Sequence, residues 1–250
     1  MSERDGYPQG VPSWADLATT DLAGAREFYG ALFGWEWEVS GPEFMHYSQA
    51  LLRGRRVVGA GPVMGEGQPV GWMTYLAVDD ADKVVESVAA AGGTVIVPPM
   101  EIPESGRMAL AADPTGAAFG LWEAAAHRGS ELVNEPGTVV WNELVTPDPA
   151  AARPFYTATL GLEWTEEDVD GEPYSLFAVG GRTAGGATPG STPHWELYFE
   201  VADTEASVAR ARELGAEVLS PVTPTPQGPM AVLRDPQGGR FSIIASGSTV

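Results

Sequence analysis

The stretch "PSWADLATTDLAGAREFYGALFGWEWE", residues 12–38, decides the fold because a related stretch returns later in the chain. Its counterpart is "VVWNELVTPDPAAARPFYTATLGLEWTEE", residues 139–167. Trp14 and Trp141 lie 127 positions apart, and the Phe-Tyr pair that begins at Phe28 is repeated at the same offset. A constant offset over many residues is typical of an internal duplication.

A second pair of related stretches follows the two copies of the first. "VDDADKVVESVAAAGGTVIVPP", from Val78, matches "VADTEASVARARELGAEVLSP", from Val201, at an offset of 123. "ADPTGAAFGLWE", from Ala112, matches "RDPQGGRFSII", from Arg234, at an offset of 122. The chain therefore contains four related units, and the small changes in offset are expected to lie in loops.

Each unit has the pattern of a strand, a helix and three further strands. Trp14, Asp16 and Ala18 alternate as residues on one face of a strand do. Asp21 is a suitable N-cap for the helix that follows, and Gly34 is a suitable residue to end it. Alternating residues and turn signals after the helix predict a strand and then a hairpin.

We therefore predict an α+β fold of two tandem domains, each with two paired βαβββ units that form a curved sheet around a cavity. A single unit would leave one face of its sheet bare, and pairing lets this face line a shared cavity. The predicted domains span 8–126 and 137–247, and the polar segment 127–136 is the linker. The predicted units span about 12–65, 70–124, 137–188 and 193–246.

This organisation resembles the vicinal-oxygen-chelate superfamily of glyoxalases, bleomycin-resistance proteins and extradiol dioxygenases. The resemblance rests on "DLAGAREFYGALFGW", on the "AVDD…AGGTV" segment and on the DPTG and DPQG turns, and it covers roughly Pro12 to Ala245. The tandem layout is similar to two-domain members described as glyoxalase-like or hydroxylase proteins. Since the superfamily hosts many activities, the resemblance is specific for the fold and weak for the reaction.

Metal-binding members of the superfamily hold the ion with His, Glu or Gln on the first and last strands of each unit. Carried over to this chain, these positions fall on Trp14, Met73, Gly59 or Gly61, and Gly120 in the first domain, and on Trp141, Glu196, Gly185 or Gly186, and Ser242 in the second. Only Glu196 offers a carboxylate, whereas a divalent ion needs three or more converging ligands. We therefore predict no cofactor, and a divalent metal (Zn, Ni, Fe or Mn) at a misaligned site is the alternative.

Large aromatic side chains are predicted to face both cavities, where they can stack on a flat organic ligand. The alternative is that they fill the barrels as core. The complete predicted ligand-binding set is Trp14, Asp16, Met73, Tyr75, Trp122, Trp141, Glu143, Glu196, Tyr198 and Ser242.

Three carboxylates are candidates for chemistry. Asp16 and Glu143 lie two residues after the equivalent tryptophans, on the same face, where a carboxylate can accept a proton or hold a ligand hydroxyl. A structural hydrogen bond to a loop is the alternative. If Glu143 and Glu196 approach each other, their pKa values separate into an acid and a base, so these two are the predicted catalytic residues. His194 lies two positions before Glu196 in the sequence.

Composition limits the partners. The formal net charge is −20 and no cluster of basic residues offsets it, so nucleic acid is an unfavourable partner. The absence of cysteine excludes disulfides and thiolate metal sites. Neither a leader-like N-terminus nor an apolar run near 18 residues is present, so we expect a cytoplasmic protein without membrane contact, as a monomer or homodimer.

The leading functional prediction is metal-independent binding of a small, partly aromatic organic molecule, as the resemblance to the bleomycin-resistance branch implies, for sequestration, resistance or secondary metabolism. The alternative is an enzyme: a glyoxalase-like lyase or isomerase, or a hydroxylase-type oxygenase, that uses Glu143 and Glu196 or a misaligned metal. A third interpretation is a structural protein whose cavities have collapsed.

Overall fold

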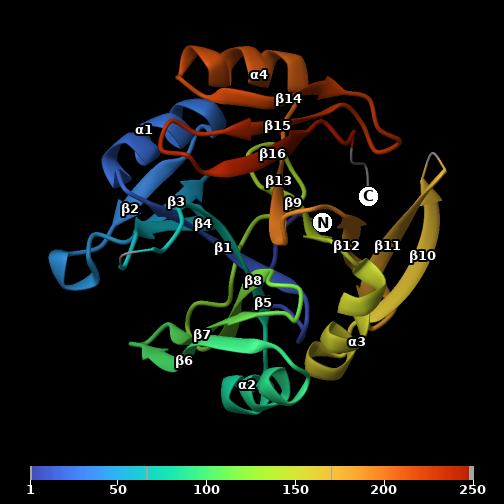
Figure 1. Ribbon diagram of the computed structural model, residues 1–250. Helices are drawn as coiled ribbons and strands as arrows, with labels where there is room; N and C mark the ends of the chain where they lie inside the picture. Colours follow the sequence, from blue (N-terminus) through green and yellow to red (C-terminus); the bar gives the residue numbers. More distant parts are fainter. Residues whose placement is uncertain (1, 66, 170, 248–250) are drawn as a thin grey trace.

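In the computed structural model, which describes residues 2–65, 67–169 and 171–247, the chain forms two curved sheets of eight strands each (Figure 1). The first half comprises β1 (Pro12–Thr19), α1 (Leu22–Phe33), β2 (Glu36–Val39), the 3-10 helix η1 (Pro42–Phe44), β3 (Ser48–Leu52), β4 (Arg55–Pro62), β5 (Gly71–Ala77), α2 (Ala81–Ala90), β6 (Thr94–Ile102), β7 (Gly106–Ala112) and β8 (Ala118–Ala124). The second comprises β9 (Val139–Thr146), α3 (Pro149–Leu160), β10 (Glu163–Val169), β11 (Glu172–Val179), β12 (Arg182–Pro189), β13 (His194–Glu200), α4 (Thr204–Glu213), β14 (Glu217–Thr223), β15 (Met230–Arg234) and β16 (Arg240–Ile244).

The two sheets have the same topology. Their strand orders are β2-β3-β4-β1-β5-β8-β7-β6 and β10-β11-β12-β9-β13-β16-β15-β14. In each sheet the first strands of the two units, β1 with β5 and β9 with β13, pair antiparallel at the centre. The last strand of each unit then pairs parallel to the first strand of that unit. This pairing confirms the predicted tandem α+β fold of four βαβββ units.

The duplicated helices begin and end in the same way. The Asp21 side chain caps α1 by accepting a hydrogen bond from the backbone N–H of Gly24, and the helix ends at Gly34 in the left-handed conformation. Asp148 and Gly161 perform the same two tasks for α3. The carboxylate satisfies one of the free N–H groups of the first turn, and glycine adopts a positive φ without a steric penalty. Both predicted boundaries of the first helix are thus confirmed.

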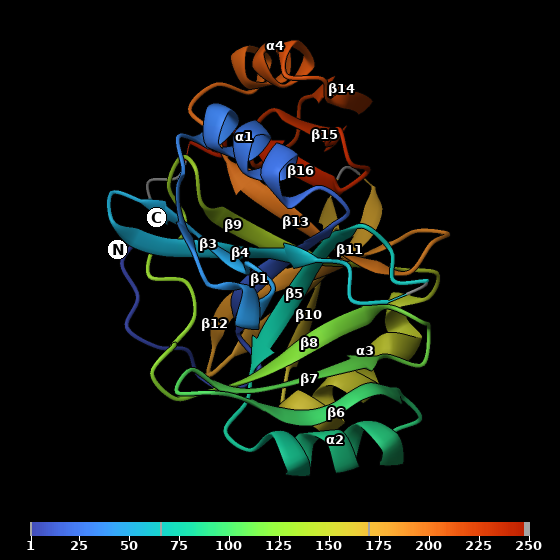
Figure 2. The same cartoon turned by 90° about the vertical axis from the view of Figure 1, so that its left-hand side faces the viewer.

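Each helix packs against a helix of the other half of the chain, α1 against α4 and α2 against α3. One hydrophobic cluster joins α1 and its strands to α4, β13 and β16, and a second joins α2, β7 and β8 to α3 and β9. The two views agree, with α1 beside α4 and α2 near α3 (Figures 1 and 2). The two helix pairs, each with its own hydrophobic cluster, lie at opposite ends of the molecule, and the opposite face of each sheet lies away from the helices.

Two buried tyrosine–aspartate hydrogen bonds cross between the two halves of the chain. The Tyr29 hydroxyl donates to Oδ2 of Asp235 at 2.8 Å, and the Tyr156 hydroxyl donates to Oδ2 of Asp113 at 3.0 Å. Oδ1 of each aspartate accepts backbone N–H groups of its own DPTG or DPQG turn. The turns that carry the family resemblance therefore also join the two halves, a role that the sequence does not reveal.

Among the described residues, none of the helices combines the length and the apolar composition needed to cross a membrane.

Candidate functional site

Two rows of residues cross the central strands on the face opposite the helices, which we call the inner face. In the second sheet, Glu143 on β9 lies between Gly186 on β12 and Glu196 on β13. Directly opposed residues in an antiparallel pair have Cβ atoms about 5 Å apart, so the two predicted catalytic carboxylates are neighbours. The adjacent row contains Trp141, Tyr198 and Ser242.

The first sheet has the same rows with different residues. Asp16 lies between Gly59 and Met73, whereas Trp14 pairs with Tyr75. The first-strand positions taken from the metal-binding pattern, Trp14 and Met73, therefore fall in different rows. In the second sheet the positions of Trp141 and Glu196 are separated in the same way.

Glu143 is held by two tyrosines. Its Oε1 accepts from the Tyr174 hydroxyl at 2.7 Å, and its Oε2 accepts from the Tyr198 hydroxyl at 2.9 Å. The indole N–H of Trp141 donates to the Tyr174 oxygen at 3.0 Å. Burial raises the pKa of Glu143 above its ordinary value, and the two phenol hydrogen bonds oppose this rise only in part. Burial therefore makes Glu143 easier to protonate than an exposed glutamate.

The first sheet repeats this motif with a shorter carboxylate. Oδ1 of Asp16 accepts from the Tyr47 hydroxyl at 2.6 Å and from the Trp14 indole N–H at 2.8 Å. Burial likewise raises the pKa of Asp16. Since both copies retain a carboxylate, a tyrosine and a tryptophan in contact, the motif belongs to the duplicated fold as well as to any site built upon it.

The aromatic residues predicted for the first cavity pack on one another. Trp14, Tyr75 and Trp122 form a separate buried cluster, 5 to 7% exposed, and Met73 packs against it. The ring of His127 contacts Trp14 edge-on, with centroids 4.3 Å apart. This half of the molecule thus matches the alternative interpretation, in which the aromatic residues act as core.

The second sheet carries a polar cluster around Glu196. Oε2 accepts from Nε of Arg240 at 2.6 Å and contacts Nε2 of His194 at 3.0 Å, and Oε1 accepts from the Ser242 hydroxyl at 2.7 Å. Burial opposes ionisation of Glu196, but the hydrogen bond from His194 and the charge of Arg240 outweigh it and lower the pKa of Glu196. Glu196, only 3% exposed, is therefore a buried anion.

His194 faces two hydrogen-bond acceptors. Its Nδ1 lies 2.8 Å from the carbonyl oxygen of Thr192, and its Nε2 lies next to Glu196. Both ring nitrogens can donate only in the protonated form, and the hydrogen bond to Glu196 raises the pKa of His194. When His194 is protonated, the cluster contains two cations, His194 and Arg240, around one carboxylate.

Comparison with known proteins agrees with this architecture. Residues 12–121 match the Glyoxalase/Bleomycin resistance protein/Dioxygenase superfamily, and residues 138–244 match the glyoxalase-like domain. The chain is 43% identical over 256 residues to a protein of Mycobacterium tuberculosis named "Putative glyoxylase CFP32", with 98% of each chain covered. The chain belongs to the Glyoxalase/Bleomycin resistance protein/Dioxygenase superfamily.

A further relative and two solved structures extend the comparison. The anthracycline biosynthesis protein DnrV of Streptomyces peucetius is 38% identical, over 95% of this chain and 94% of that protein. The 2,3-dioxygenase LapB of Pseudomonas sp. KL28 superposes with a TM-score of 0.66 at 17% identity, over 95% of this chain and 93% of that one. The Mn(II)-bound glyoxalase of Novosphingobium aromaticivorans gives 0.63 at 15% identity, over 100% and 87%. These two structures show the shared fold.

The residues of this superfamily member do not fit a metal ion at the inner faces. A Cβ atom at Gly59 would overlap the hydroxyl of Tyr47, and one at Gly186 would overlap the hydroxyl of Tyr174. At Gly120 it would overlap the ring of Tyr75. Within residues 2–65, 67–169 and 171–247, no group of three or more His, Asp or Glu side chains is placed to hold an ion. Tyrosines thus occupy the space that longer side chains at these glycines would need.

Tyr47, Tyr174 and Arg240 were not among the site residues predicted from the sequence. The tyrosines had a detectable signal, since a Tyr-Ser pair begins at residues 47 and 174, again 127 positions apart. Arg240 had no such signal, because the equivalent residue 122 positions earlier is Ala118. Its place beside Glu196 depends on the pairing of β13 with β16.

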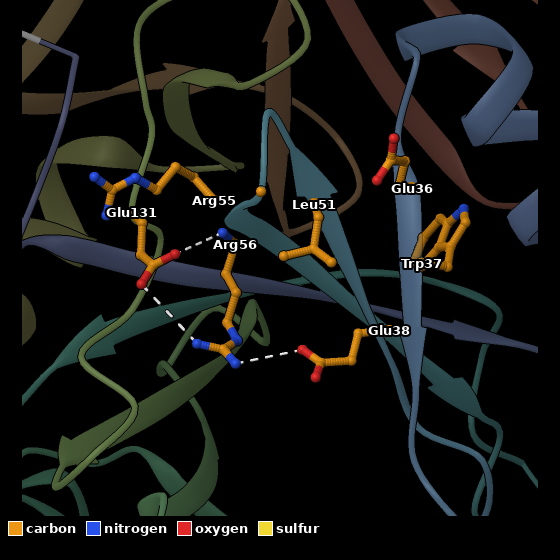
Figure 3. Close-up of a pocket in the computed structure, with 8 residues that line it drawn as sticks. Glu36, Trp37, Glu38, Leu51, Arg55, Arg56 and Glu131 are labelled. Carbon is orange, nitrogen blue, oxygen red and sulfur yellow. Dashed lines mark hydrogen bonds and ion pairs between the residues drawn. The ribbon is translucent and has the colours of Figure 1, made fainter.

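An open pocket of about 590 Å³ lies away from these rows, between the β2–β4 strands and the linker (Figure 3). Arg56 spans it, with Nη2 3.3 Å from Glu38 and its backbone N–H 2.8 Å from a carboxylate oxygen of Glu131. Since Arg56 at the centre of this pocket already pairs with Glu38 and Glu131, the inner face of the second sheet is the stronger candidate site.

Proposed function

We propose that the inner face of the second sheet binds a small, partly aromatic organic molecule without a resident metal. The observation that carries this proposal is the contrast between the two copies. The first inner face is filled by a closed aromatic cluster. The second combines a partly exposed Trp141 with hydrogen-bond donors and hydrogen-bond acceptors. A pocket that fixes a ligand usually pairs apolar surface with a few such polar groups.

The residues of the second face suggest how the ligand is held. A flat ring stacked on Trp141 gains about 0.5–1.5 kcal/mol beyond the area that it buries. Glu143 accepts hydrogen bonds from a ligand hydroxyl when ionised and donates to a carbonyl when neutral. The name of the relative DnrV, an anthracycline biosynthesis protein, supports a polycyclic aromatic ligand with hydroxyl and carbonyl groups.

The absence of a resident metal is supported by the chemistry of the inner faces. Glu196 is engaged by Arg240, His194 and Ser242, and Glu143 by two tyrosines. An ion would have to displace these donors, and glycines stand at the positions from which further ligands would come. A site for a divalent ion needs at least three ligands in fixed geometry.

Calorimetric titration with 1,4-dihydroxyanthraquinone tests the proposal. We expect binding that is equal before and after treatment of the protein with EDTA. Trp141→Phe should weaken binding about five-fold through loss of stacking area, and the matched variant Trp14→Phe in the first sheet should leave it unchanged. Elemental analysis of the purified protein should find no stoichiometric transition metal.

Two results would overturn the proposal. Near-stoichiometric Ni, Zn, Fe or Mn that is lost together with ligand binding would establish a metal site. Equal weakening by Trp14→Phe and Trp141→Phe would remove the assignment to the second sheet.

A second candidate function is a glyoxalase-like isomerase, and the opposite pKa shifts of the paired carboxylates favour it. The raised pKa makes Glu143 the stronger base of the pair, and the lowered pKa of Glu196 favours its charged form. Glu143 would move a proton from the hydroxyl-bearing carbon of a hemithioacetal to the adjacent carbonyl carbon, while the hydroxyl proton moves to the former carbonyl oxygen, which yields an α-hydroxy thioester. The assay is the formation of thioester from methylglyoxal and glutathione, and it should be abolished in Glu143→Gln; no turnover by the wild type would reject this candidate.

A further inference from the structure

The cluster around Glu196 is present in only one of the two duplicated sheets. The residues equivalent to His194, Glu196 and Arg240 in the first sheet are Gly71, Met73 and Ala118, at the offsets of 123 and 122 that relate the two copies. Both sheets have the same strand order and pairing. The duplicated fold therefore forms without these charged groups.

The cluster is also costly to maintain. A carboxylate removed from water loses several kcal/mol of solvation, and pairing must compensate for this loss. The first sheet avoids the cost with Met73. Because the first sheet folds and pairs without a buried anion here, the role of Glu196 lies in the side chain that it holds in place.

The group that Glu196 holds is the guanidinium of Arg240. Glu196 engages only Nε of this arginine, and the two terminal NH2 groups have no partner among the interactions of the described residues. The Arg240 side chain is 46% exposed and that of His194 31%, whereas Glu196 lies beneath them. Arg234, directly opposite Arg240 on β15, is paired with Glu217 at 2.5 Å. Arg240 thus presents unpaired donors at the edge of the inner face.

These donors suit one chemical group. A guanidinium with two free NH2 groups matches the two oxygens of a carboxylate, which it binds through paired charge-assisted hydrogen bonds. With His194 protonated, the cluster carries a net charge of +1 in a chain whose formal charge is −20. It therefore attracts an anion locally while the rest of the protein repels one.

We propose that Arg240, held in position by Glu196, binds a carboxylate of the ligand, so that the substrate class is a polycyclic aromatic carboxylic acid. This inference rests on the proposed function. Glu143 on β9 and Arg240 on β16 are two strand spacings apart, roughly 10 Å between Cα atoms. Fused aromatic rings span such a distance, with a hydroxyl or carbonyl group at Glu143 and the carboxylate at Arg240.

The test compares two ligands that differ in charge. Anthraquinone-2-carboxylate and the neutral 2-(hydroxymethyl)anthraquinone are titrated into the full-length protein by calorimetry. The wild type should bind the carboxylate about tenfold more tightly than the alcohol, as expected for charge-assisted hydrogen bonds. Arg240→Gln should abolish this preference, so that the two ligands bind with equal affinity. Arg212→Gln, on α4, removes the same charge elsewhere and should retain the preference.

Further variants keep the test informative if Arg240→Gln does not fold. Arg240→Lys retains the charge beside Glu196 but loses the paired NH2 groups, so the preference should fall several-fold. Glu196→Gln should reduce the preference for the carboxylate although Arg240 is still present, which identifies Glu196 as a positioning residue.

The possible failures are distinguishable. Equal binding of both ligands by the wild type overturns the carboxylate site and leaves the proposed function intact. A preference that persists in both Arg240 variants also overturns it. Binding of neither ligand overturns the carboxylate site together with the proposed function.

Discussion

Glu143 and Glu196 lie opposite each other on the neighbouring strands β9 and β13, yet their surroundings shift their pKa values in opposite directions. Glu143 meets neutral phenols, and burial dominates its pKa. Glu196 meets a guanidinium and an imidazole, and these hold it ionised. The difference shows that burial alone does not decide the charge of a carboxyl group; the charge of its hydrogen-bond donors does.

The raised pKa of Glu143 predicts a stability that depends on pH. The folded state binds this proton more tightly than the unfolded chain, so the contribution of Glu143 to the free energy of unfolding falls as the pH rises from the ordinary value of 4.5 through the folded pKa. Asp16, whose pKa is also raised, and His127, whose pKa is lowered, titrate in both proteins, so their contributions cancel in the difference between wild type and Glu143→Gln. Urea unfolding at several pH values should show that the free energy of unfolding of the wild type declines relative to that of the variant over this range. Parallel curves for wild type and variant would contradict the prediction.

His127 predicts a loss of stability in acid. Burial, together with the nearby charge of Arg56, lowers the pKa of His127 to about 4, although Glu131 opposes this shift. The unfolded chain therefore binds more protons at His127 between pH 6.5 and 4, and this group should lower the free energy of unfolding by up to about 3 kcal/mol as the pH falls through this window. His127→Phe, which keeps ring contact with Trp14, should remove the loss. The exposed His46→Gln is the control and should leave it unchanged.

At the scale of the elements, glycines on strands β4 and β12 leave space for tyrosine side chains on the inner faces. A side chain at Gly59 or Gly186 would collide with the tyrosine that holds the inner-face carboxylate. Glycine is therefore required at these positions by close packing across the strand pair rather than by a turn.

Gly186→Ala should displace Tyr174 from Glu143. Overpacking of this kind costs about 1–3 kcal/mol of folding free energy, and it should also weaken ligand binding because the hydrogen bond to Glu143 is lost. Urea unfolding measures the first effect and calorimetry the second. Gly6→Ala, where a Cβ atom would meet no neighbour within 4 Å, is the matched control. A Gly186→Ala protein with wild-type stability would show that the tyrosine ring has room to shift.

For the whole molecule, the packing of helices from the two halves joins the two sheets into one cooperative unit. Each hydrophobic cluster draws residues from both halves of the chain. Neither half buries its helix face without the other, so unfolding of one half exposes the core of the other.

We therefore predict a single calorimetric unfolding transition in which both buried tyrosine–aspartate hydrogen bonds take part. Tyr29→Phe and Tyr156→Phe should each lower the free energy of unfolding by about 1–3 kcal/mol, since each leaves a buried carboxylate oxygen without its donor. The transition should remain single in both variants. Two separate transitions in the wild type would contradict the shared core.

The sequence alone was sufficient for the duplication, the four βαβββ units and the caps at Asp21 and Gly34. These features depend on local periodicity and on short-range hydrogen bonds, which are visible within a few residues of one another. The constant offset also predicts the order of the units along the chain, because related stretches are expected to fold alike. Family membership follows from the same motifs.

Only the tertiary structure decided which side chains meet. Strand register placed Glu143 opposite Glu196 and brought Arg240 to Glu196, and the packing of helices from the two halves paired Tyr29 with Asp235, 206 positions away. It also showed that one inner face is closed by aromatic packing while the other retains polar groups. Such contacts depend on how distant strands and helices fit together, and no local pattern in the chain encodes that fit.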